Sequence, residues 1–241
     1  ENFRKARENG ALPAPRSPEV LARDTFMNLG RWASEITKAY FGRGEALLDT
    51  VSVQGLEHYR EALSRGKGVI FVTGHCGNWE LLVLSFARKI GPVLGVARKQ
   101  SNPYMDRFIS RARKRYETDF VYKEGALRRF ISHLRGGGSV GVLMDQSVLP
   151  EEGVLIEFLG RPAWNTRMPV ALARRTGAAL LPVFIRAHED GHEITVLPEY
   201  TPTGDELEDT RRLSGYIEDF IRANPTQWLW IHRKWKRAPK E

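Results

Sequence analysis

A short apolar run that passes through a glycine-containing turn into an apolar helix constrains the fold of this chain more than any other feature. Residues 69–73 read Val-Ile-Phe-Val-Thr, and residues 81–86 read Leu-Leu-Val-Leu-Ser-Phe. A continuous β-branched and apolar run of this length is typical of a strand buried on both faces. Strands of that kind occur in parallel sheets covered by helices, so the segment predicts an α/β fold.

The alternation of strand and helix continues along the chain. Further strands are predicted at 93–97, 139–144, 179–185 and 193–196, and helices at 18–48, 56–64, 103–116, 127–134, 168–176 and 209–223. Within 18–48, Gly30, Gly42 and Gly44 are candidate interruptions. We therefore expect one domain over residues 1–241, with a mixed, mainly parallel sheet flanked by helices and with N-terminal amphipathic helices. Residues 1–17, polar and basic, are expected to be a loosely held lead-in.

The charge balance favours anionic partners. The 241 residues include 37 Lys and Arg against 29 Asp and Glu, which gives a net charge of +8. Such a balance suits phospholipid headgroups, phosphorylated glycans, acidic carrier proteins or nucleic acid, and does not choose among them. The single cysteine, Cys76, excludes an intrachain disulfide framework, so a reducing, cytoplasmic compartment is expected.

No apolar run approaches the roughly 18 residues that a spanning helix needs. Because the chain opens at Glu1 rather than at a methionine, we expect that an upstream segment is missing, and an N-terminal membrane anchor is one candidate for it.

The turn after the first predicted strand carries residues suited to proton transfer. His75 follows the strand 69–73, and Glu80 stands at the start of the next predicted helix. Open parallel sheets place their ligands at the carboxyl ends of strands, so both side chains are expected at a site. A histidine held by a carboxylate keeps one tautomer and takes a proton from a hydroxyl group. We therefore predict His75 as a general base and Glu80 as the group that orients it.

Four ordered blocks carry a family resemblance. They are Gly-His-Cys-Gly-Asn-Trp-Glu at 74–80, Asp145-Gln146 after a strand, Ala-Leu-Ala-Arg-Arg-Thr-Gly-Ala at 171–178, and Pro-Thr-Gln-Trp-Leu-Trp-Ile-His-Arg-Lys-Trp-Lys at 225–236. Together they resemble the lipid A biosynthesis lauroyl/myristoyl acyltransferases, a branch of the lysophospholipid acyltransferase superfamily with its His-x4-acid motif. The similarity spans about residues 15 to 237.

The resemblance implies that a fatty acyl chain moves from an acyl thioester, acyl-carrier protein or acyl-CoA, to a hydroxyl of a lipid A precursor or related glycolipid. It implies His75 as base, Glu80 as its partner, no metal or other cofactor, and work at an anionic membrane surface on the cytoplasmic face of the bacterial inner membrane. The residues that match the family's site region, and are predicted to bind substrate, are Arg98, Arg113, Asp145, Gln146 and Asn78.

Other interpretations remain open. Another lipid, such as a phosphatidylinositol mannoside or a lysophospholipid, is an alternative acceptor. A basic nucleic-acid-binding protein fits the charge, but no recognised nucleic-acid motif appears and we expect no nucleic-acid partner. A serine hydrolase would need a G-x-S-x-G elbow, which the chain lacks. Cys76 beside His75 is a further candidate nucleophile. The aromatic and basic tail at 228–236 fits either core packing or an interfacial belt.

Overall fold

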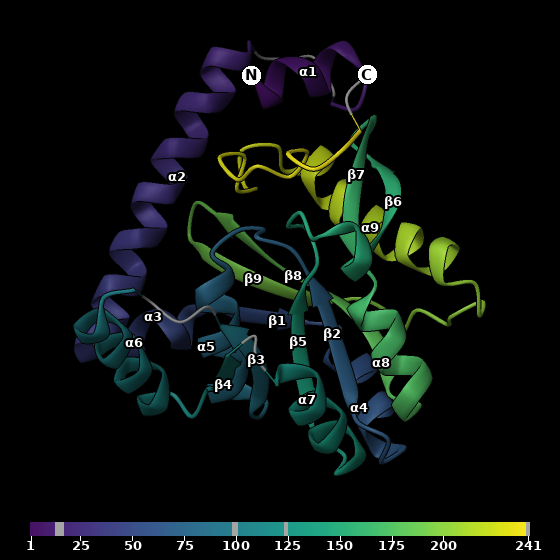
Figure 1. Cartoon of the computed structure of the whole chain (residues 1–241). Helices are drawn as coiled ribbons and strands as arrows, with labels where there is room; N and C mark the ends of the chain where they lie inside the picture. Colours follow the sequence, from purple (N-terminus) through teal and green to yellow (C-terminus); the bar gives the residue numbers. More distant parts are fainter. Residues whose placement is uncertain (13–16, 98–100, 123–124, 240–241) are drawn as a thin grey trace.

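A seven-stranded sheet forms the centre of the protein in the computed structural model, which describes residues 1–12, 17–97, 101–122 and 125–239 (Figure 1). The strand order is β1-β9-β8-β2-β5-β3-β4. The strands are β1 Ser52–Gln54, β2 Val69–Thr73, β3 Val93–Ala97, β4 Asp119–Tyr122, β5 Ser139–Leu143, β8 Ala179–His188 and β9 Gly191–Val196. Every neighbouring pair is parallel except β8 and β9. The prediction of a mixed, mainly parallel sheet is therefore confirmed.

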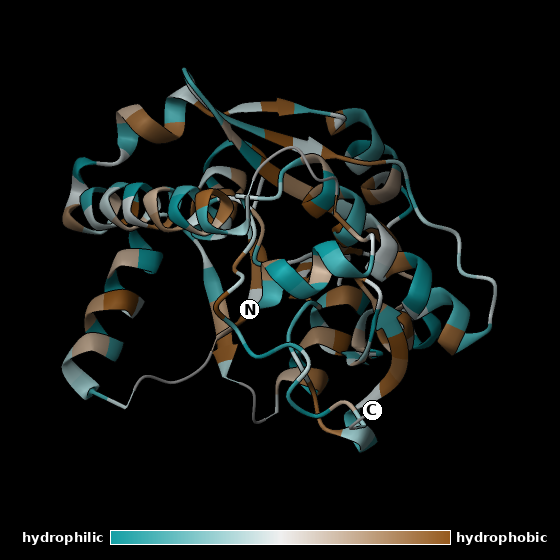
Figure 2. Cartoon of the chain, turned by 90° about the horizontal axis from the view of Figure 1, so that it is seen from above, coloured by the Kyte–Doolittle hydropathy of each residue, from teal (hydrophilic) through white to brown (hydrophobic). Residues whose placement is uncertain are grey.

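Helices surround this sheet, as the alternating pattern predicted. They are α1 Asn2–Glu8, α2 Pro18–Lys38, α3 Glu45–Thr50, α4 Leu56–Ser64, α5 Trp79–Lys89, α6 Pro103–Arg115, α7 Ala126–Arg135, α8 Met168–Thr176 and α9 Glu206–Ala223. Short turns, η1 Ala39–Arg43 and η2 Pro150–Glu152, and the antiparallel hairpin of β6 Gly153–Phe158 and β7 Arg161–Thr166 complete the fold. Along the ribbons of the helices, hydrophobic and hydrophilic residues alternate, as they do in amphipathic helices (Figure 2).

Strand β2 separates two apolar cores. All five of its residues are buried. Ile70 and Val72 pack with residues of α7, α8 and α9 on one face, whereas Val69 and Phe71 pack with residues of α4 and α5 on the other. Because successive side chains of a strand point to opposite faces, an unbroken apolar run is what a doubly covered strand requires.

The N-terminal region differs in part from the prediction. Residues 2–8 form α1 rather than a loose lead-in, because Phe3 and Ala6 are buried and the ring of Phe3 stacks on Trp230 at 4.1 Å. Gly42, with φ of 79°, breaks the helical run between α2 and α3, whereas Gly30 lies inside α2. Among the described residues, no helix is both long and apolar enough to cross a membrane.

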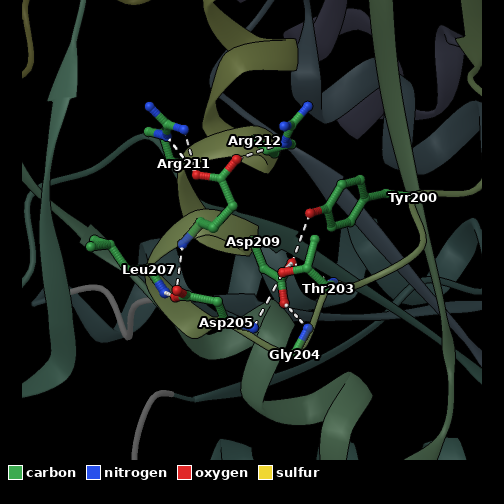
Figure 3. A network of polar contacts seen from close by, with 9 residues as sticks. Tyr200, Thr203, Gly204, Asp205, Leu207, Asp209, Arg211 and Arg212 are labelled. Carbon is green, nitrogen blue, oxygen red and sulfur yellow. Dashed lines mark hydrogen bonds and ion pairs between the residues drawn. The ribbon is translucent and has the colours of Figure 1, made fainter.

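A buried carboxylate fixes the loop that leads into α9 (Figure 3). The Asp209 side chain is fully buried and accepts hydrogen bonds from the Tyr200 hydroxyl at 2.8 Å, from the Thr203 N–H at 2.7 Å and hydroxyl at 2.8 Å, and from the Gly204 N–H at 3.2 Å. Asp205 caps the same helix by accepting from the N–H of Leu207 at 2.8 Å. The two aspartates therefore fix the start of a helix whose inner face fills the core.

We expect Asp209→Asn to lower the free energy of unfolding by about 1–3 kcal/mol, because the amide replaces one acceptor oxygen with a donor in a buried site. Denaturant unfolding measures this change. Asp219→Asn is the matched control on α9, since Asp219 is exposed and its ion pair with Arg222 is on the surface; its effect should stay within about 0.5 kcal/mol. Equal effects of the two changes would contradict the role given to Asp209.

Candidate active site

The geometry of two adjacent parallel strands brings His75 and Asp145 together. The register pairs Thr73 at the end of β2 with Leu143 at the end of β5. Two residues further along each chain, His75 Nδ1 lies 2.8 Å from Asp145 Oδ1, and the His75 backbone N–H donates to Oδ2 at 2.8 Å. The carboxylate therefore holds both the ring and the backbone of His75.

Asp145 is both buried and ionised. Its side chain is fully buried, and Oδ2 accepts a hydrogen bond from the Trp228 indole N–H at 2.8 Å. The Nε2 atom of His232 lies 3.7 Å from the same oxygen. Burial alone would raise the pKa of Asp145, but the charge of His75, the hydrogen bond from its ring and the nearby His232 hold the pKa well below its usual range. The group is therefore a carboxylate at neutral pH.

The Nε2 atom of His75 is available to accept a proton. With Nδ1–H donated to Asp145, Nε2 is the acceptor, and it lies 3.2 Å from the side-chain nitrogen of the exposed Gln146. The Trp79 ring packs edge-on against the imidazole at 5.1 Å. Burial lowers the pKa of His75, but the charge and hydrogen bond of Asp145 outweigh it and raise the pKa above that of an ordinary histidine. This arrangement suits a general base.

Glu80 has a different partner from the one predicted. Arg113 of α6 donates from Nε to Oε1 at 2.9 Å and from Nη2 to Oε2 at 3.2 Å, and the Tyr40 hydroxyl donates to Oε1. The structure thus corrects the expectation that Glu80 orients His75, because Asp145 occupies Nδ1 and Glu80 forms a two-pronged pair with a guanidinium. Glu80 stands in the first turn of α5, where the helix dipole also favours its charge.

Arg113 lies at the wall of a small cavity. Its guanidinium sits 3.9 Å from the centre of the Phe120 ring, and its side chain is 19% exposed. Thr118, Phe120 and Tyr122 line the same cavity of about 120 Å³. Burial lowers the pKa of Arg113, but the hydrogen bond and charge of Glu80 outweigh it and raise the pKa. Glu80 therefore keeps the guanidinium of Arg113 charged and fixed at the wall of this cavity.

Asn78 is buried and hydrogen-bonded within the protein. It is 2% exposed; its Oδ1 accepts from the Leu81 N–H at 3.2 Å and caps α5, while its Nδ2 donates to Glu35 Oε2 at 2.9 Å. Glu35 also accepts from His192 at 3.0 Å and from Arg31 at 2.9 Å. Both polar ends of Asn78 are thus used within the protein, and its role in substrate binding stays a prediction.

The C-terminal tail completes the site, and the sequence did not assign it there. Leu229 N–H donates to the His75 carbonyl at 3.1 Å, and Gly77 N–H donates to the Gln227 carbonyl at 2.6 Å. Cys76 and Trp228 form a β-bridge between these bonds. Trp228 is fully buried, and Trp230 and Trp235 are also buried, so the core interpretation holds for these three rings.

Two predicted residues remain, the candidate nucleophile Cys76 and the candidate substrate-binding residue Arg98. The Cys76 thiol is buried, and burial together with the charge of Asp145 raises its pKa well above the usual range, so it does not form the thiolate that a nucleophile requires. Arg98 lies outside the described residues.

We expect Asn78→Ala to lower the free energy of unfolding by about 2–4 kcal/mol, because it removes a helix cap and a hydrogen bond to the buried Glu35. Thermal or denaturant unfolding measures the loss. Asn102→Ala is the matched control, since Asn102 also caps a helix, through Tyr104 N–H at 2.9 Å, but on the exposed surface; about 1 kcal/mol is expected there. A loss at Asn78 no larger than at Asn102 would argue against the buried link to Glu35.

Comparison with known proteins identifies the family of this chain. The sequence model of the family described as bacterial lipid A biosynthesis acyltransferase matches residues 11–237. The lipid A biosynthesis lauroyltransferase of Escherichia coli K12 is 28% identical over 220 residues, covering 89% of this chain and 71% of that protein. The phosphatidylinositol mannoside acyltransferase of Mycobacterium tuberculosis H37Rv is 30% identical over 248 residues, covering 98% and 77%. The lipid A biosynthesis palmitoleoyltransferase of E. coli K12 is 27% identical over 228 residues, covering 92% and 73%. The chain belongs to the bacterial lipid A biosynthesis acyltransferase family and is an O-acyltransferase.

Proposed function

We propose that this protein transfers a fatty acyl chain from an acyl thioester, carried by acyl-carrier protein or coenzyme A, to a hydroxyl of a lipid A precursor or related glycolipid. The observation that carries the proposal is the His75–Asp145 pair at the carboxyl ends of β2 and β5. The lipid A acyltransferases among the relatives support the first acceptor class. The relatives named phosphatidylinositol mannoside acyltransferases favour a second candidate, a mannosylated phosphoinositide.

His75 acts as the base in this proposal. Its Nε2 takes the proton of the acceptor hydroxyl while the hydroxyl oxygen attacks the thioester carbonyl carbon. Asp145, ionised and bonded to Nδ1, stabilises the imidazolium that forms. When the tetrahedral intermediate collapses, the carbon–sulfur bond breaks and the imidazolium returns its proton to the departing thiolate. A thiolate is already a good leaving group, so we expect that the reaction needs no metal or other cofactor.

Gln146 and Arg113 are the proposed polar partners of substrate. The side-chain nitrogen of Gln146 lies beside His75 Nε2, where the reacting atoms would meet, and we assign it to the oxyanion of the intermediate. The backbone N–H of Gly77, another donor close to His75, is already bonded to the Gln227 carbonyl, so we do not assign it to the oxyanion. Arg113 supplies a fixed positive charge for an acceptor phosphate. Arg98 is proposed for the same task from the sequence alone.

The donor and the location complete the proposal. The net charge of +8 suits an acidic acyl-carrier protein better than a neutral partner. The same charge suits an anionic membrane surface, and we propose the cytoplasmic face of the bacterial inner membrane as the place of reaction.

We expect His75→Ala and Asp145→Asn each to lower kcat for acyl transfer by about 10³-fold or more, because one removes the base and the other stabilises the wrong tautomer. The measurement is transfer from labelled acyl-carrier protein or acyl-CoA to a lipid A precursor in detergent. Circular dichroism of each variant serves as the folding control. Wild-type rates in a folded His75→Ala variant would exclude His75 as the base, and no transfer by the wild type to any glycolipid would exclude the proposed acceptors.

The pH dependence of kcat/KM distinguishes Asp145 from Glu80 as the partner of His75. Neutral His75 is the active form, so kcat/KM should rise with pH and level off above the pKa of His75, which Asp145 raises above that of an ordinary histidine. Asp145→Asn removes the charge that raises this pKa, so the acidic limb should move to lower pH. Glu80→Gln, an equivalent acid-to-amide change, should leave the limb in place because Glu80 binds Arg113. A limb that moves in Glu80→Gln but not in Asp145→Asn would restore Glu80 as the partner of His75.

A further inference from the structure

The segment after β5 carries two important side chains of the site but has no regular structure of its own. Residues 144–149, between β5 and η2, belong to no helix or strand. Within it, Asp145 holds the ring of His75, and the Gln146 side-chain nitrogen lies 3.2 Å from His75 Nε2. A donor stabilises an oxyanion effectively only if it is held in place before the reaction, so contacts from elsewhere in the fold must fix this segment.

Two cationic side chains of the C-terminal tail hold the backbone of this segment. Lys234 Nζ donates to the Gln146 carbonyl at 3.5 Å. Arg237, three residues further along the tail, donates from Nη1 to the Ser147 carbonyl at 3.2 Å. The indole of Trp228, from the same tail, bonds to the residue before Gln146. Three successive residues of the segment are therefore tied to the tail.

Lys234 also joins the segment to the β6–β7 hairpin. Its Nζ donates to Asn165 Oδ1 at 2.5 Å and to the Trp164 carbonyl at 3.4 Å, both in β7, and lies 5.0 Å from the centre of the Phe158 ring in β6. Asn165 is fully buried, and its side-chain nitrogen donates to the Ala163 carbonyl at 3.0 Å. The oxygen that anchors Lys234 is therefore itself held in place.

A lysine is costly at this position. Its side chain is fully buried, and no carboxylate in the part of the chain that the structure describes forms an ion pair with it. Burial lowers the pKa of Lys234 to about 7, although the charges of Asp145 and Glu218 act in the opposite direction. An apolar side chain of similar length would fill the space without this cost. A buried amine bonded only to neutral oxygens therefore indicates a role other than packing.

We propose that Lys234 is a positioning residue for acyl transfer, which fixes the Gln146 backbone and thereby holds the Gln146 amide beside His75 Nε2, where the oxyanion forms. The inference rests on the proposed function, because Gln146 has its role there. Lys234 is shielded from solvent and acts through Gln146 rather than on the substrate. Removing its side-chain nitrogen should therefore weaken stabilisation of the intermediate and lower kcat without changing KM.

The test is a double-mutant cycle on transfer from labelled acyl-carrier protein or acyl-CoA to a lipid A precursor in detergent. The four proteins are the wild type, Lys234→Met, Gln146→Ala and the double variant. Methionine is unbranched and similar in length to lysine but has no N–H donor. Lys236→Met is the matched control, since Lys236 lies two residues along the same tail and is exposed. Circular dichroism of each variant checks the fold.

We expect Gln146→Ala to lower kcat by about 10²-fold, as loss of one oxyanion donor does. Lys234→Met should lower kcat by about tenfold and change KM by less than about twofold, because the donor is displaced rather than removed. The double variant should have the kcat of Gln146→Ala, since the position of an absent donor has no effect. The Lys236→Met control should keep the wild-type kcat. Losses that multiply in the double variant would overturn the inference, as would a wild-type kcat in Lys234→Met.

Lys234→Gln takes the place of Lys234→Met in the cycle if the methionine variant does not fold. Glutamine keeps N–H donors in an uncharged side chain, but this side chain is one atom shorter and cannot reach both β7 and the Gln146 carbonyl. Its kcat should again fall, and the loss should again disappear in combination with Gln146→Ala. Multiplying losses would overturn the inference for this variant too.

An NMR measurement without donor or acceptor separates this inference from the proposed function. The side-chain amide of Gln146 gives a nitrogen–proton signal that is identified by its loss in Gln146→Ala. Lys234→Met should shift this signal, and Lys236→Met should leave it in place. An unmoved signal in Lys234→Met overturns the inference. A shifted signal together with no acyl transfer by the wild type would mean that the proposed function fails while Lys234 still fixes the position of Gln146.

Discussion

The buried Asp145 carboxylate is the interaction on which the site depends. An ionised group without water is costly unless its oxygens accept enough hydrogen bonds, and Asp145 receives them from the backbone and ring of His75 and from the indole of Trp228. These donors come from the turn after β2 and from the C-terminal tail. The charge is stabilised only when both segments are in place at the end of β5, so the site depends on the packed core around it.

A second set of carboxylates organises the surroundings of the base. Glu80 pairs with Arg113 and Tyr40, and Glu35 pairs with Asn78, so α2, α5 and α6 are joined through buried or half-buried charges. The two carboxylates therefore have different roles. Asp145 sets the tautomer of His75, and Glu80 holds the guanidinium of Arg113 in place.

The sequence predicted the regular elements well where their pattern was strong. Strands β2 and β3 and helices α4 and α8 have the predicted bounds, because an unbroken apolar run or a clear helical period identifies them. Strands β1 and β4 and the hairpin of β6 and β7 were missed. Their sequences, such as Ser-Val-Gln and Arg-Pro-Ala-Trp-Asn-Thr, are short or mixed in polarity, so pairing with neighbouring strands decides their conformation. Helix α1 likewise depends on its packing against Trp230.

The sequence by itself determined the α/β class, the strand, turn and helix around His75, and the set of polar residues from which the site is drawn. Which acid meets His75 was decided only by the tertiary structure. Glu80 is five residues away in the chain, yet Asp145, seventy residues away, holds the ring. The reason is that β2 and β5 are adjacent and in register, and the order of strands in a sheet comes from the packing of the whole chain rather than from any local pattern.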